Sequence, residues 1–351
     1  MKVIILAAGL GSGMKSLSEL TPKSLVPIAN RPIIEHLINS FQKVNVSEIV
    51  ILVGHLKDQM IEFFKKIDLP SIDINIVRAK NYEKGPIYTF YSARNQYFKE
   101  DFILSPSDLF LSPEIISNLV HYHKKGSISI AIDSSKRQKQ GTQVFTYSES
   151  RLNSQHKFIK YGKVSGFNNR VLNKSEASAV AIPIMICSPT IFDYVENAIA
   201  QNEKNVTSAL NIYIKKLKPL NYFDIPNYYW FDIDNLNDIL SVNKFALNNN
   251  ITPTNHISPT REGRVKDMKF PGINLFHPTT KIIPPIIIGE NCYLKINSRI
   301  GPYVSLYDSC GLEANSEVEN SIVFGNSQVL EDSKIKNKII YKNEIIDVNL
   351  S

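Results

Sequence analysis

"MKVIILAAGLGSGMKSLSELTPKSLVPI" forms residues 1–28 and begins with a short apolar run, Val3 to Ala8. The run leads directly into a glycine-rich segment that contains Gly9, Gly11 and Gly13. Glycine lets a backbone approach phosphate oxygens without a Cβ in the way, and the amide N–H groups of such a loop can then donate to the anion. We therefore predict a buried strand over 2–8 that ends in a phosphate-binding loop.

Strands and helices alternate after this first strand. The apolar run at 48–54 predicts a second buried strand, and the segments 74–79 and 101–108 predict a third and a fourth strand. Between the predicted strands lie three segments that read as helices, at 31–44, 56–67 and 87–98. This alternation is typical of an α/β fold with a doubly wound, mostly parallel sheet, in which ligands bind beyond the carboxyl ends of the strands. Both the glycine segment and Asp108 follow such ends. We also expect strands at 127–132 and 178–186 and a helix at 189–201.

The C-terminal part of the chain has a different period. Apolar residues recur at every sixth position, at Ile282, Ile288, Leu294, Ile300, Leu306, Leu312, Val318, Phe324 and Leu330. A period of six fits neither a helix nor an alternating strand, but it is typical of the hexapeptide parallel β-helix, whose triangular coils each hold three hexads. Residues 248–263 are rich in Asn, Thr and Pro and suit a linker. We expect an α/β domain over 1–245, a linker over 246–281 and a β-helix over 282–351.

Composition limits the class of protein. A chain of 351 residues is long enough for two domains, and its net charge of +7 is scattered rather than concentrated in one basic run. That charge suits a solvated basic surface or an anionic ligand, and we expect neither nucleic acid nor membrane as a partner. The three cysteines form no CxxC pair, so a reduced cytoplasmic protein is expected. The first apolar run is too short for a signal peptide.

Two familiar phosphate-binding motifs fail at the glycine segment. A dinucleotide fingerprint would need glycine where Met14 stands, and a P-loop would need glycine immediately before Lys15. The segment instead resembles the signature of the nucleotide-sugar pyrophosphorylases. The matching stretches are Leu6-Ala7-Ala8-Gly9, Gly11-Ser12 and Thr21-Pro22-Lys23-Ser24-Leu25-Val26-Pro27-Ile28. The whole arrangement is similar to the long-form glucose-1-phosphate thymidylyltransferases, which carry a C-terminal left-handed β-helix.

This resemblance implies a reaction and a set of site residues. An NTP and a sugar 1-phosphate would give an NDP-sugar and pyrophosphate, with Mg²⁺ bridging phosphate oxygens. Lys23 and Asp108 would be catalytic, and Asp108 and Asp232 would hold the metal; Trp230, the only tryptophan, marks the alignment of the second aspartate. Nucleotide contacts would come from Leu6, Ala8, Gly9, Gly11, Ser12, Gly13 and Gly85, and sugar-phosphate contacts from Asn169 and Arg170. Without the resemblance, either aspartate could equally be a cap or turn residue.

The sequence departs from the family pattern at ligand-facing positions. Gly13 replaces the signature arginine that grips the departing pyrophosphate, while Ser107 and Ala181 replace glycines and Asn169 replaces a glutamate. Three alternatives to the usual reaction follow. The substrate could be an altered sugar or alcohol phosphate, the protein could be an impaired homologue that binds nucleotide sugars and regulates an active paralogue, or it could be a dehydrogenase or kinase. Exposed β-helix ends predict a homo-oligomer.

Overall fold

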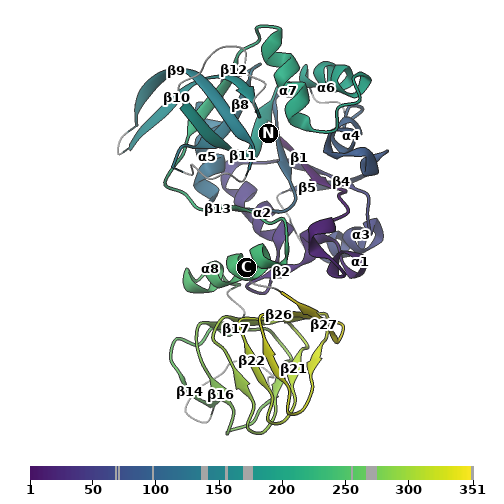
Figure 1. Ribbon diagram of the computed structural model, residues 1–351, viewed down its shortest axis with the longest axis vertical. Helices are drawn as coiled ribbons and strands as arrows, with labels where there is room; N and C mark the ends of the chain where they lie inside the picture. The colour runs from purple at the N-terminus through teal and green to yellow at the C-terminus, as the bar shows by residue number, and fades with distance from the viewer. Residues whose placement is uncertain are drawn as a thin grey trace. The chain divides into compact units, whose positions relative to one another are not determined.

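A computed structural model describes residues 1–67, 69, 72–96, 99–135, 141–154, 157–168, 177–253, 256–265 and 275–348 (Figure 1). The chain divides into two compact units. The first comprises Met1–Leu10 and Leu37–Asp232, and the second comprises Gly11–His36 and Ile233–Ser351. The glycine segment is therefore shared, since Gly9 belongs to the first unit and Gly11 and Gly13 to the second.

A nine-stranded sheet in the order β5-β4-β1-β6-β11-β8-β12-β10-β9 forms the centre of the first unit. Seven strands run in one direction, as the pairings require: β1 (Lys2–Ala7), β4 (Glu48–Val53), β5 (Asp73–Arg78), β6 (Phe102–Pro106), β8 (Ile128–Asp133), β9 (Gln143–Ser154) and β12 (Leu220–Asp224). The strands β10 (Lys157–Phe167) and β11 (Ala177–Cys187) run the other way. The predicted doubly wound, mostly parallel sheet is confirmed.

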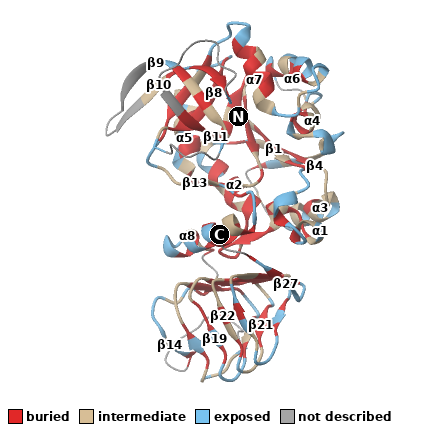
Figure 2. Ribbon diagram, viewed as in Figure 1, coloured by how far each residue is buried: buried red, intermediate tan, exposed pale blue. Residues whose placement is uncertain are grey.

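Helices pack on this sheet through apolar faces, and Figure 2 shows the burial concentrated along the strands. One core joins the sheet to α4 (Pro86–Tyr91), α6 (Ile191–Ala200) and α7 (Val206–Lys215). The rings of Phe90, Phe102 and Phe192 meet there, with centroids 5.0–6.2 Å apart. Among the described residues, the other helices of eight or more residues are α3 (Lys57–Lys66) and α5 (Pro113–Tyr122) in the first unit, α8 (Leu236–Asn248) in the second, and α2 (Ile33–Phe41), whose residues fall in both. The helix expected over 87–98 is shorter, because α4 ends at Tyr91.

The second unit contains three sheets of short strands that stack coil upon coil. The first sheet holds β14 (Gly263–Arg264), β16 (Lys281–Ile282), β19 (Arg299–Ile300), β22 (Glu317–Glu319) and β25 (Lys334–Lys336). The second holds β15 (Leu275–Phe276), β18 (Tyr293–Leu294), β21 (Gly311–Leu312) and β24 (Gln328–Val329). The third holds β17 (Ile286–Ile288), β20 (Val304–Leu306), β23 (Ile322–Phe324), β26 (Lys338–Tyr341) and β27 (Glu344–Asp347). Apart from the end strands β14 and β27, the pairings are parallel. We call this stack of three sheets the coil.

The six-residue register holds only as far as Val318. Ile300 pairs with Val318, eighteen residues on, but Leu306 pairs with Val323, seventeen residues on. One residue is missing from the corner at Asn320, so Val323 and Val329 fill the interior positions expected for Phe324 and Leu330. The prediction for Leu330 is wrong, since it is 66% exposed. Phe324 instead packs on Tyr341 outside the interior column, with ring centroids 4.5 Å apart.

Among the described residues, no helix is both long enough and apolar enough to span a membrane.

Candidate functional site

Two aspartates from distant parts of the sequence meet in the first unit. Asp108 lies just beyond the carboxyl end of β6, before β7 (Leu109–Leu111). The strand β13 (Trp230–Asp232) pairs antiparallel with β7, and this register places Asp232 opposite Leu109. The carboxylates of Asp108 and Asp232 therefore each offer an oxygen, and these oxygens lie within 4.8 Å of each other. The structure thus brings together the two residues that the sequence analysis assigned to the metal.

A buried hydrogen bond anchors the strand that carries Asp232. Trp230 Nε1 donates to Asp133 Oδ2 at 2.9 Å, and the indole is 7% exposed. Asp133 ends β8 and also accepts from the amide of Ser135 at 2.9 Å. Because a buried indole N–H needs an acceptor, this bond fixes the direction of β13 against the main sheet.

The donor set of the aspartate pair fits Mg²⁺. Magnesium prefers oxygen ligands, and proteins usually supply one or two carboxylates while water and phosphate oxygens complete the shell. Asp108 is half-buried and Asp232 is exposed, so one side of the pair is open to an incoming ligand. Asp108 and Asp232 are the residues that would hold the ion.

A cavity of about 350 Å³ lies at the same end of the sheet in the first unit. Leu6 of β1 and Leu104 and Pro106 of β6 line it, so its wall ends two residues before Asp108. Part of its lining is aliphatic, and polar side chains come from Thr142, Asn168, Asn205 and Thr207. This size and lining suit one small organic group with a few oriented polar contacts. The predicted nucleotide contact Leu6 is in the lining, whereas Asn169 and Arg170 lie outside the described residues.

Gly85 stands immediately before the cavity-lining Pro86 and is required there by its backbone. Its φ is +135°, and a Cβ at this position would lie 2.7 Å from the carbonyl oxygen of Lys204. The amide of Ile87 donates to that same oxygen at 3.1 Å, which joins the start of α4 to the residues before α7. The structure thus supplies a structural reason for this glycine, and its nucleotide contact stays a prediction.

Gly11 of the signature lies beside Lys23 in the second unit. Gly11 adopts the left-handed conformation with φ +65°, and a Cβ there would lie 3.5 Å from Cβ of Lys23. Ser12 and Gly13 are exposed in the short helix η1 (Ser12–Met14). Lys23 Nζ forms an ion pair with Asp234 Oδ1 at 3.3 Å, a partner that the sequence analysis did not assign. An ammonium group thus lies next to an exposed glycine loop. In the first unit, Ala8 is buried and Gly9 is exposed beyond the end of β1.

Close backbone packing explains the glycine at position 13. A Cβ on Gly13 would lie 2.1 Å from the carbonyl oxygen of Asp234, well inside van der Waals contact. An arginine at this position would therefore require the chain at Asp234 to move. The loss of the signature arginine is built into the packing of the second unit, and Lys15, two residues on, is an exposed cation of the same segment.

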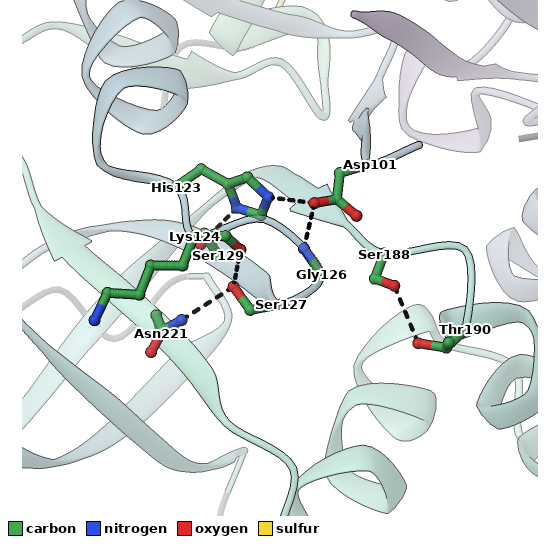
Figure 3. Close-up of polar contacts among 9 residues, drawn as sticks. All are labelled: Asp101, His123, Lys124, Gly126, Ser127, Ser129, Ser188, Thr190 and Asn221. Carbon is green, nitrogen blue, oxygen red and sulfur yellow. Dashed lines mark hydrogen bonds and ion pairs between the residues drawn. The ribbon is translucent and has the colours of Figure 1, made fainter. Parts of the chain in front are cut away.

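A buried polar cluster at the amino ends of the strands has the composition of a hydrolase triad but not its access (Figure 3). His123 bonds to Ser129 Oγ through Nδ1 and to Asp101 Oδ2 through Nε2, both at 2.9 Å. Asp101 Oδ2 also accepts from the amide of Gly126 at 2.6 Å. Ser129 is 0% exposed, so it cannot attack a substrate in this structure. The cluster links the starts of β6 and β8 to the end of α5. It therefore lies at the amino ends of these strands, whereas Asp108 lies beyond the carboxyl end of β6.

Comparisons with known proteins agree with the fold of the first unit. The family described as the MobA-like NTP transferase domain matches residues 3–205. A bifunctional sugar-1-phosphate nucleotidylyltransferase/acetyltransferase of Sulfurisphaera tokodaii is 26% identical, over 97% of this chain and 79% of the relative. A glucose-1-phosphate thymidylyltransferase of Streptomyces griseus is 22% identical, over 97% and 92%. A UDP-glucose pyrophosphorylase solved with UDP-glucose superposes with a TM-score of 0.59 at 16% identity, over 71% of this chain and 98% of that structure. By its match over more than half of its length, the chain belongs to the family of MobA-like NTP transferase domains.

Proposed function

We propose that this protein is a Mg²⁺-dependent sugar-1-phosphate nucleotidyltransferase, which makes an NDP-sugar and pyrophosphate from an NTP and a sugar 1-phosphate. The observation that carries the proposal is the pair Asp108 and Asp232, brought together by the β7–β13 register beside a cavity at the carboxyl end of the sheet. The relatives named for this reaction match nearly the whole chain.

The reaction is a direct displacement. A phosphate oxygen of the sugar 1-phosphate attacks the α-phosphorus of the NTP, and the bond from that phosphorus to the bridging oxygen of the β-phosphate breaks. Pyrophosphate leaves with that electron pair, and no covalent enzyme intermediate forms. Catalysis of this kind depends on holding two anions together and stabilising the charge that moves to the leaving group.

Each candidate residue has one task in this scheme. Asp108 and Asp232 would hold Mg²⁺, which would supply positive charge to the phosphate oxygens when bound. The amides of Gly11 to Gly13 donate to the triphosphate, and the Lys23 ammonium exchanges its exposed partner Asp234 for a phosphate oxygen. The Lys23 side chain is 14% exposed and the Asp234 side chain is 73% exposed. The Asp234 carboxylate can therefore be solvated by water when Lys23 leaves it.

The decisive experiment is a panel of NTPs against sugar 1-phosphates with detection of pyrophosphate. We expect Mg²⁺-dependent pyrophosphate release with at least one pair and a loss of 100-fold or more in Asp108→Asn. The matched control is Asp193→Asn, an exposed aspartate on α6. Equal activity of the Asp108 variant and the control would contradict the proposal.

A second function is favoured by one observation, the tight packing of Gly13 on Asp234. An impaired homologue that binds a nucleotide sugar and regulates an active paralogue would not need the missing arginine. Such a protein binds an NDP-sugar in equilibrium dialysis and releases no pyrophosphate with any pair in the panel. A dehydrogenase would bind NAD(H) instead.

The architecture supports a finer division of the chain. We propose a nucleotidyltransferase-like domain over 1–245, a linker over 246–281 and a left-handed hexapeptide β-helix over 282–351; the eighteen-residue offset between paired strands supports the last. Within the linker range, β14 and β15 already pair with strands of the coil, so the coil extends into the end of that range. The homo-oligomer and the cytoplasmic location stay predictions.

A further inference from the structure

A strained hairpin follows the phosphate-binding lysine in the second unit. β2 (Pro27–Ile28) and β3 (Arg31–Pro32) are joined by Ala29 and Asn30, whose φ values are +44° and +59°. The left-handed region is unfavourable for an ordinary L-residue, and alanine has no polar side chain to offset this cost. Such a backbone persists only where the surroundings hold it.

Two buried asparagines hold this turn. Asn243 of α8 is 1% exposed, and its Oδ1 accepts from the amide of Ala29 at 2.8 Å and from Ser305 Oγ at 2.7 Å. Asn30 Nδ2 donates to the carbonyl oxygen of Leu306 at 2.7 Å. Ser305 and Leu306 both belong to β20, so α8 and the coil together determine where the turn lies.

The turn is joined to Lys23 by a short and internally bonded segment. The amide of Val26 donates to the carbonyl of Lys23 at 3.2 Å, and the amide of Ile33 donates to the carbonyl of Val26 at 3.1 Å. The short helix η2 (Lys23–Leu25) therefore ends at the base of the hairpin. Because these hydrogen bonds restrain the segment between the turn and Lys23, a displacement of the turn should also displace Lys23.

We propose that Asn243 is a positioning residue for Lys23, and that the coil serves as the anchor of the phosphate-binding segment. Asn243 acts through the Ala29–Asn30 turn and touches no substrate. Its Oδ1 is a single acceptor shared by two buried donors, so its removal leaves the amide of Ala29 and the hydroxyl of Ser305 without that acceptor. The catalytic part of this inference rests on the proposed function, whereas its structural part does not.

Hydrogen exchange of the full-length protein tests the structural part. We expect the amides of residues 22–33 to exchange at least 10-fold faster in Asn243→Ala than in the wild type. Asn248→Ala is the matched control, because Asn248 is an exposed asparagine on the same helix. Unchanged exchange over 22–33 in Asn243→Ala would overturn the inference, even if the protein has no nucleotidyltransferase activity.

A double-variant cycle tests the catalytic part. We expect Asn243→Ala to lower kcat about 10-fold in the wild-type background but less than 2-fold in a Lys23→Ala background, because the effect passes through Lys23. An equal loss in both backgrounds would contradict a positioning role. If Asn243→Ala does not fold, Ser305→Ala leaves the bond from Ala29 in place and should increase exchange over 22–33 by a smaller factor; no increase would count against the proposal.

Discussion

If Asp108 and Asp232 hold Mg²⁺ as proposed, removing one of their carboxylates should stabilise the protein without metal and abolish its response to Mg²⁺. Two unit charges 4.8 Å apart repel by about 0.9 kcal/mol at the dielectric constant of water and about 3.5 kcal/mol at an effective value of 20. Asp232 is exposed and Asp108 is half-buried, so the lower part of this range applies. We expect Asp232→Asn to raise the free energy of unfolding of the first unit by about 1 kcal/mol in EDTA, which is a rise of about 3 °C in Tm.

Magnesium should stabilise the wild type and have no effect on the stability of Asp232→Asn. At ten times its Kd, the ion stabilises the wild type by about 1.4 kcal/mol through mass action and leaves Asp232→Asn unchanged. Thermal unfolding measures both effects when it is followed by circular dichroism and by the fluorescence of Trp230, the only tryptophan. Asp193→Asn should show the wild-type response. An undiminished magnesium shift in Asp232→Asn would refute the assignment of this pair as the metal site, whatever its stability in EDTA.

Three further predictions follow from local packing. Gly85→Ala should destabilise the protein by about 1–3 kcal/mol more than Gly126→Ala in urea unfolding, because a Cβ at Gly85 meets the Lys204 carbonyl whereas one at Gly126, also at positive φ, meets nothing within 4 Å; equal losses would contradict this. Burial lowers the pKa of His36 from 6.5 to about 4, so the unfolded chain takes up the proton first, and stability should fall by at most about 3 kcal/mol as the pH drops from about 6.5 to about 4. His36→Gln should lack this part of the decline in acid titrations of stability. Burial also raises the pKa of the thiols of Cys187, Cys292 and Cys310, so iodoacetamide at pH 8 should label them only after unfolding, as mass spectrometry would show.

Local patterns in the sequence predicted the elements of the sheet well. The runs Val3 to Ala8 and Ile49 to Val53 are continuously apolar because parallel strands covered on both faces have no polar side, and these runs lie in β1 and β4. The six-residue period predicted the interior of the coil as far as Val318, since each turn of the coil repeats the same inward positions. The position of Asp108 was also predictable, because the segment 101–108 reads as a strand and Asp108 stands at its carboxyl end.

The sequence by itself therefore determined which segments form strands of the main sheet, where a glycine loop follows one of them and which residues fill the coil interior as far as Val318. The family resemblance predicted that Asp108 and Asp232 share a metal, but no local pattern shows their contact, because it depends on the pairing of β7 with β13 across more than a hundred residues. Only the tertiary structure decided that Gly13 packs against the backbone of Asp234, that Asn243 holds the turn after Lys23, and that a shortened corner turns Leu330 outward. A local window reports which side of a segment is apolar, whereas these contacts depend on which distant backbone packs against it.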